Sequence, residues 1–203
     1  MNKNFMFCIF FVSSCAQITV QDYRSAFNSL FQEKSEIKVN TEYIGNRNFS
    51  FAKVKIGNEN PAILSLLTIE NNLFTWISAN GEKLITRNGK IIESFGLEHD
   101  FAVINPAGFK LDSSSNEMII QLENPKAIIT QNNMVDFAGE EQLFLDKKYE
   151  VELFIENFSS NPISWSGQNY YWKDVSSGLI IRTHQHVHPY EKSIELEFYY
   201  IFK

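Results

Sequence analysis

The sequence lacks the signatures of several common enzyme classes. It has only nine glycines in 203 residues, and it contains no phosphate-binding loop, no dinucleotide-binding fingerprint and no Gly-x-Ser-x-Gly nucleophile motif. Its two cysteines are too few for a disulfide framework. Catalysis by nucleotide, serine or cysteine chemistry therefore has no support in the sequence, and we expect a protein that is not an enzyme and has no cofactor.

Positive charge is also scarce. Eighteen Lys and Arg residues stand against 24 Asp and Glu residues, so the formal net charge is −6 at pH 7. An acidic chain of this kind argues against nucleic acid as a partner and against a basic patch that binds lipid headgroups. With five prolines and no biased tract, the chain predicts a single domain that spans residues 15–203.

The N-terminus reads as an export signal. Lys3 precedes an apolar run from Phe5 to Val12, which is followed by Ser13, Ser14 and Cys15. The run is far too short to span a bilayer, and a cysteine at the end of such a segment is typical of a bacterial lipobox. We therefore expect residues 1–14 to be a lipoprotein signal peptide.

Cys15 is the predicted lipidation site and the first residue of the mature protein. The alternative is an ordinary secretory signal that is cut near Ala16. Cys8 lies inside the signal, so Cys15 would have no disulfide partner, and a thioether-linked lipid accounts for that odd thiol. Lipoproteins retained in the inner membrane commonly carry aspartate after the cysteine, so Ala16 favours the outer membrane.

One short helix is predicted near the start of the domain, at about residues 19–34. Asp22 can cap its start, and Phe27, Leu30 and Phe31 recur at helical spacing on one side. From about residue 36 onward, strands are expected instead.

Alternating apolar and polar residues predict those strands. Between residues 149 and 156 apolar side chains alternate with glutamates, and the same pattern recurs between residues 194 and 202. We expect half-buried strands that expose glutamates such as Glu156 and Glu195 to water. Shorter apolar runs over residues 62–69, 118–122 and 127–130 predict further strands.

Two Asn-Gly pairs, Asn80-Gly81 and Asn88-Gly89, separate apolar segments between residues 73 and 95. Asn-Gly favours the two-residue type I′ turn, whose twist matches that of paired strands. This stretch therefore predicts a three-stranded meander. Strand after strand without intervening helices predicts an all-β fold, an antiparallel meander curled into a barrel or a sandwich.

Three of the four histidines lie close together as His184, His186 and His188. On a strand, residues two apart share a face at about 6.6 Å, a spacing that lets two imidazoles bind one metal ion with a third ligand from elsewhere, such as His99. The alternation after Leu179 places the three on the polar face. An exposed polar row is the simpler interpretation, because no acidic or cysteine cluster stands near them in sequence.

Aromatic residues are concentrated in Trp165, Tyr170, Tyr171 and Trp172, among several asparagines and glutamines. Flat rings stack on the apolar faces of sugars and amides bond to sugar hydroxyls, so the group is a candidate saccharide or partner contact. Filling the core is the other use of such rings in a β protein.

Several segments together resemble the YjbF/GfcB family of lipoproteins. They are Leu73–Gly81, Leu84–Ile91, Gly96–Asp100, Asn169–Trp172, Ser177-Gly178, Gln185 and Pro189. With the lipobox in front, the resemblance covers nearly the whole chain.

The resemblance implies a role in exopolysaccharide or group 4 capsule export, at the periplasmic face of the outer membrane. It also implies outer-membrane β-barrel and periplasmic export components as partners, and polysaccharide as a ligand. No catalytic residue carries over. Among the polar residues of these segments, Arg87, between the two Asn-Gly pairs, is the strongest candidate for a contact with glycan or a partner. A salt bridge at a strand end explains it equally well. The alternative function is a metal-dependent or carboxylate-dependent enzyme that modifies the polymer.

Replacing Cys15 with Ser should release the protein from membranes into the soluble periplasm and leave folding unchanged, because the residue precedes the domain. Fractionation of cells followed by immunoblotting measures this. A Cys15→Ser protein that still sediments with membranes would contradict the lipobox or reveal a partner that holds the chain there.

Overall fold

The computed structural model describes residues 37–105, 111, 115–160 and 163–201. The predicted signal peptide at residues 1–14, Cys15 and the predicted helix at residues 19–34 lie outside the described residues.

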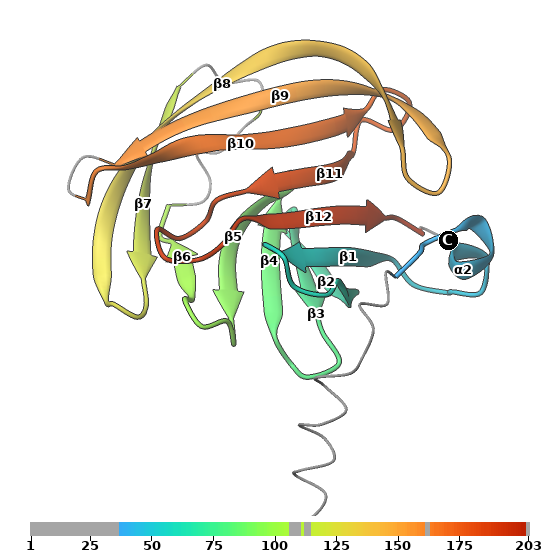
Figure 1. The fold of residues 1–203 in the computed structure, drawn as a ribbon, viewed down its shortest axis with the longest axis horizontal. Coiled ribbons are helices and arrows are strands. Elements are labelled where there is room, and N and C mark those ends of the chain that lie inside the picture. The colour runs from blue at the N-terminus through green and yellow to red at the C-terminus, as the bar shows by residue number, and fades with distance from the viewer. Residues whose placement is uncertain (1–36, 106–110, 112–114, 161–162, 202–203) are drawn as a thin grey trace, which may run out of the picture. The chain divides into compact units, whose positions relative to one another are not determined.

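Twelve antiparallel strands of the described residues form a closed barrel (Figure 1). Each strand pairs with its neighbours in sequence, and β1 pairs with β12 to close the sheet. The strands are β1 (Phe51–Ile56), β2 (Ala62–Glu70), β3 (Leu73–Ile77), β4 (Lys83–Arg87), β5 (Lys90–Phe95), β6 (Phe101–Val103), β7 (Asn116–Leu122), β8 (Ala127–Phe144), β9 (Lys148–Ser160), β10 (Trp165–Asp174), β11 (Ile180–Gln185) and β12 (Ile194–Tyr199). The expected all-β meander is confirmed, and it is a barrel.

Only one of the two Asn-Gly pairs forms the predicted turn. Asn88 and Gly89 both have positive φ, 48° and 77°, and they join β4 to β5 directly. At Asn80-Gly81 only the glycine has positive φ, and five residues separate β3 from β4. The type I′ turn predicted there is wrong. Asn71-Asn72, for which no turn was predicted, has two positive φ values and joins β2 to β3.

A helix of five residues, α2 (Thr41–Gly45), precedes β1. Asn40 caps it, because its side-chain oxygen accepts a hydrogen bond of 2.8 Å from the backbone N–H of Tyr43. The first described strand therefore begins at Phe51 rather than near residue 36. No helix in the described ranges has the length and apolar character needed to cross a membrane.

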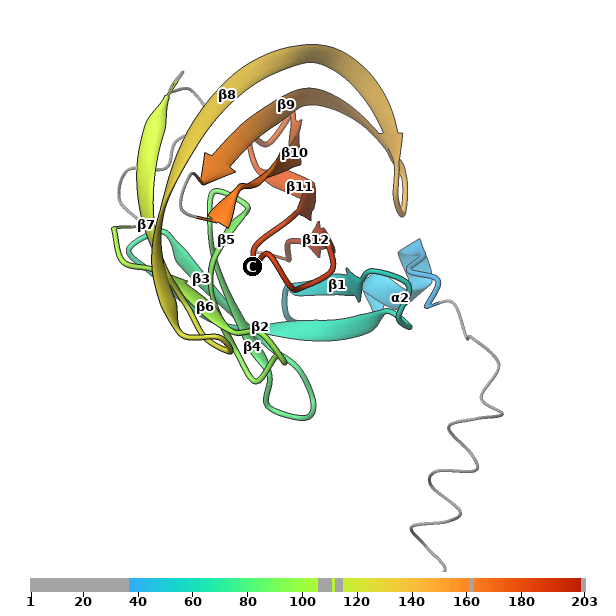
Figure 2. The same cartoon turned by 60° about the vertical axis from the view of Figure 1, so that its left-hand side comes forward.

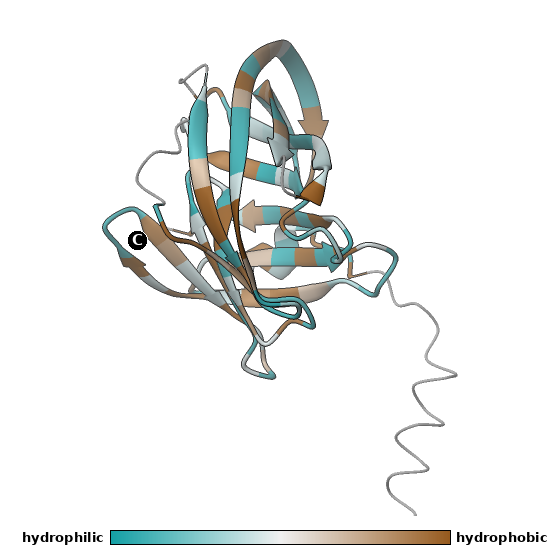
Figure 3. Cartoon of the chain, turned by 90° about the vertical axis from the view of Figure 1, so that its left-hand side faces the viewer, coloured by the Kyte–Doolittle hydropathy of each residue, from teal (hydrophilic) through white to brown (hydrophobic). Residues whose placement is uncertain are grey.

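Apolar and polar residues alternate along the strands (Figure 3). On β12, Leu196 and Phe198 are buried inside the barrel and the glutamates face outward, as the alternation predicts. Trp76 is fully buried in the core, where its ring lies 5.2 Å from that of Phe198 and its Nε1 donates a hydrogen bond to the hydroxyl of Thr86. Burial of each such side chain stabilises the fold by about 1.5–3 kcal/mol.

Strand β9 reverses the expected orientation. Glu156, predicted to face water, has no exposed surface and points into the barrel. Its backbone is opposite Asn169 of β10, and both side chains lie on the face that also carries Tyr171. The prediction is wrong because Lys90, 66 residues away in sequence, supplies a counter-charge for Glu156 in the interior, while Val151 of β9 packs in a second apolar cluster with Leu143 and Ile181. Figures 1 and 2 show the long β8–β9 hairpin as an arch.

A buried ion pair crosses the interior. The ammonium group of Lys90, at the start of β5, lies 2.5 and 2.7 Å from the two carboxylate oxygens of Glu156. Tyr171 and Asn169 donate hydrogen bonds of 2.7 and 2.8 Å to Oε2 of the same carboxylate. The negative charge is thus neutralised and hydrogen-bonded, which is the condition for burying it. Burial and the neighbouring carboxylate raise the pKa of Tyr171 well above 10, so its hydroxyl stays a donor.

Replacing Glu156 with Gln should lower the free energy of unfolding by about 3–5 kcal/mol, because the Lys90 ammonium stays buried without its counter-charge. The matched control is Glu59→Gln. The Glu59 carboxylate pairs with Lys192 at the surface, at 3.2 Å, and its removal should change stability by less than about 1 kcal/mol. Urea denaturation followed by circular dichroism measures both variants, and equal effects would show that the buried pair is not important for stability.

Candidate functional site

The four clustered aromatic residues divide between the two faces of β10. Tyr171 and Trp165 belong to the interior face, and Trp165 packs edge-on against the buried ring of Phe158. Tyr170 and Trp172 lie on the outer face and are half-buried. Tyr171 is therefore not available as a surface contact, whereas the contact predicted for Trp165, Tyr170 and Trp172 stays a prediction.

The outer rings of Tyr170 and Trp172 continue into a row with His184 and His186. Tyr170 lies between Trp172 and His184, at centroid distances of 6.1 and 6.0 Å, with ring planes within 24° and 13°. His186 follows, 5.6 Å from His184. All four side chains are partly exposed. We call Trp172, Tyr170, His184 and His186 the ring row.

Polar groups border the ring row. Tyr170 donates a hydrogen bond to Gln168, whose amide donates in turn to Asn157, at 2.8 and 2.9 Å. On the other side, the guanidinium of Arg182 lies over the Trp172 ring at 5.0 Å. A partly exposed aromatic surface beside amide and guanidinium donors has the chemistry that binds sugars.

Two carboxylates hold the end of the row at Trp172. The indole Nε1 donates a hydrogen bond to Glu141 of the β8–β9 arch, and Arg182 contacts Glu195 of β12 at 3.5 Å. Sequence reasoning missed Glu141, since it is 31 residues from Trp172 and only the curvature of the arch brings the two together.

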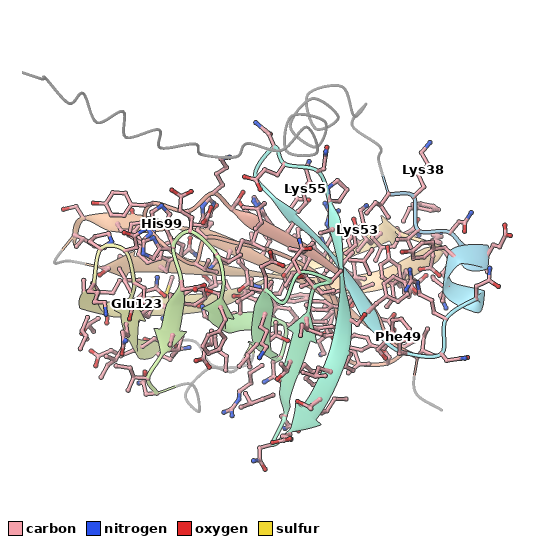
Figure 4. The ribbon with its side chains drawn as sticks, turned by 90° about the horizontal axis from the view of Figure 1, so that it is seen from below. Lys38, Phe49, Lys53, Lys55, His99 and Glu123 are labelled. Carbon is pink, nitrogen blue, oxygen red and sulfur yellow. The ribbon has the colours of Figure 1, made fainter. Side chains whose placement is uncertain are left out.

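His184 and His186 lie on the outer face, as the alternation predicts, but His188 does not. Strand β11 ends at Gln185, and His188 is only 1% exposed. Its ring stacks on His99 at 5.0 Å and lies 5.9 Å from Tyr190. His99 in turn lies 2.7 Å from the backbone carbonyl of Asn124. The cluster thus joins the β5–β6, β7–β8 and β11–β12 connections. They lie at the end of the barrel away from α2, where Figure 4 shows His99 and Glu123.

The histidines do not assemble a metal centre in the described part of the chain. No three His, Cys, Asp or Glu side chains there are placed to hold a metal ion. His184 does lie opposite Glu195 in the β11–β12 register, but that carboxylate contacts Arg182. Burial, and then the charge of His184, lower the pKa of His186, which favours a neutral ring.

Arg87, at the end of β4, is half-buried. Within the described ranges its Nε is buried without a hydrogen-bond partner, and no carboxylate forms a salt bridge with it. The strand-end salt bridge considered above is therefore not found there.

Comparisons with known proteins agree with this fold. A family model described as "Group 4 capsule polysaccharide lipoprotein gfcB, YjbF" matches residues 24–199. The solved structure of the hypothetical lipoprotein YmcC from Escherichia coli (K12) is similar, with a TM-score of 0.70, 18% sequence identity, and coverage of 87% of this chain and 93% of that one. At that identity the likeness shows the fold alone. No curated protein matches the chain.

The buried histidine predicts a pH effect on stability. Burial, together with the proximity of His99, lowers the pKa of His188 to about 4 from an ordinary value of 6.5. Between these values the unfolded chain binds a proton that the folded chain does not bind, so stability should fall as the pH drops from about 6.5 to about 4.

His188→Asn should reduce this dependence, since asparagine does not titrate and its oxygen can still accept the 3.2 Å hydrogen bond from the backbone of Tyr190. Thermal melting followed by circular dichroism between pH 7 and 4 measures the slope. An unchanged slope in the variant would assign the effect to other groups.

Proposed function

The chain belongs to the YjbF family of group 4 capsule polysaccharide lipoproteins, and on that basis we propose that it is an accessory protein of polysaccharide secretion that binds glycan without turning it over. Its family is described as a lipoprotein family rather than as an enzyme family. The sequence adds no nucleophile motif that would favour catalysis.

The ring row is the observation that supports glycan binding. Trp and Tyr side chains are highly buried on average in folded proteins, yet Tyr170 and Trp172 are turned outward while their neighbour Tyr171 fills the interior. The two rings lie parallel, side by side with His184, and hydrogen bonds hold Tyr170 and Trp172 in place. A rigid aromatic surface loses little conformational entropy when a sugar stacks on it.

The location proposed for the protein is the periplasmic face of the outer membrane. A lipid on Cys15 would hold it there, since a net charge of −6 disfavours attraction to anionic lipid headgroups. A tethered barrel in that position would meet polymer as it leaves the periplasm, with outer-membrane β-barrel and periplasmic export components as its partners.

Trp172→Ala and Tyr170→Ala should each weaken binding to the exopolysaccharide purified from the producing cells by about two- to tenfold, as expected for the loss of one aromatic contact. Affinity electrophoresis or calorimetry measures the binding. Circular dichroism must show an unchanged fold, and Tyr170→Ala is the safer variant because Trp172 also packs against the second apolar cluster.

Tyr190→Ala is the matched control, since Tyr190 is 67% exposed and belongs to the cluster of His99 and His188 rather than to the ring row. Polysaccharide binding that survives both ring-row substitutions, or that Tyr190→Ala reduces equally, would refute the assignment of the glycan surface.

A further inference from the structure

A cavity of about 470 Å³ opens at the end of the barrel where β4 ends and β5 begins. Its walls come from β3, β4, the β4–β5 turn, β9, β10, the β10–β11 connection and β11, together with Leu111 and Tyr200. We call it the mouth cavity. Its volume lies within the range of pockets that hold small ligands in proteins. It is separate from the ring row, none of whose four residues lines it.

Segments that the sequence analysis identified for their family resemblance meet at the mouth cavity. Asn88 and Gly89, from the central segments, line one wall, and Gly178, from the closing segments, lines another. About ninety residues separate these positions along the chain. Glycan binding at the ring row does not explain why these segments meet at the mouth cavity.

The interior polar network fixes the wall formed by Asn88 and Gly89. Gln185 donates a hydrogen bond of 2.8 Å to the carbonyl of Gly89 and accepts one of 3.0 Å from the N–H of Ile91. The next residue after Gly89 is Lys90, which is bound to Glu156. A Cβ atom at Gly89 would lie 2.5 Å from Ile180, so the turn is pressed against β11. The wall is therefore preorganised, as ligand sites require.

The lining combines rings with a few polar groups. Phe74 and Tyr200, which lie edge to face at 6.0 Å, and Phe154 supply apolar surface. The polar groups are the exposed side chain of Asn88 and the ammonium of Lys173, which Glu152 holds at 2.7 Å. An exposed amide and an ammonium beside aromatic faces suit the hydroxyls and ring faces of a sugar.

We propose that the mouth cavity is a second saccharide site, which takes one end of a glycan chain. This proposal rests on the proposed function, because it assumes that glycan is the ligand. The ring row is an open surface that any segment of a polymer can cross, whereas the mouth cavity is a recess that admits a chain end. Short oligosaccharides have many more chain ends per sugar than intact polymer has, so the mouth cavity should contribute more to their binding than to the binding of intact polymer.

Two variants test the mouth cavity in the full-length lipidated protein in detergent. Leu179→Trp replaces an aliphatic side chain on the cavity wall with a larger aromatic one. It should strongly weaken the binding of short oligosaccharides, prepared by partial acid hydrolysis of the purified exopolysaccharide. Asn88→Gly keeps the positive φ of the turn and removes only the amide, so it should weaken that binding by about two- to tenfold, as expected for one hydrogen bond. Circular dichroism checks the fold of both.

Tyr190→Ala is the matched control, because Tyr190 lines neither the mouth cavity nor the ring row, and it should bind the oligosaccharides and the intact polymer like the wild type. Wild-type binding of oligosaccharides by both mouth variants would overturn the second site and leave the ring row intact. A wild-type protein that binds neither ligand would refute the proposed function itself. Lipid that copurifies with the wild type and is absent from Leu179→Trp, detected by mass spectrometry, would overturn the assignment to sugar.

Discussion

The ion pair between Lys90 and Glu156 is the constraint on which the rest of the barrel depends. A charge inside a barrel is tolerated only if a partner reaches it from another strand, so the pair requires β5 and β9 to face each other across the interior. Gln185 adds a link from β11 to the same turn. These bonds define how the barrel closes at its mouth, where a purely apolar interior would permit other packings of similar energy.

The same network connects the core to the proposed binding surfaces. Asn169 and Tyr171 bind Glu156 inside the barrel, which orients β10 so that Tyr170 and Trp172 must point outward. Lys90 holds the β4–β5 turn, so Asn88 stands at the mouth cavity. Interior groups that a ligand would not touch thus position both of the surfaces proposed to bind glycan.

Local patterns were sufficient for much of the fold. Asn88-Gly89 encodes its own turn, and the alternation of β12 identifies the buried face correctly, because both signals depend on neighbours in sequence. Predictions failed where a distant segment determined the outcome. Glu156 is buried because Lys90 of β5 neutralises it inside the barrel. His188 is buried because its strand ends three residues earlier and its ring stacks on His99.

The sequence by itself determined an antiparallel all-β protein of the YjbF family, since two-residue periodicity and turn residues are local properties and the family segments are recognisable without coordinates. It also placed aromatic residues in β10. Only the tertiary structure decided which of them face outward, that the sheet closes into a barrel, and that Asn88 and Gly178 line one cavity. Those features depend on register and closure, which are set by contacts between strands far apart in the chain.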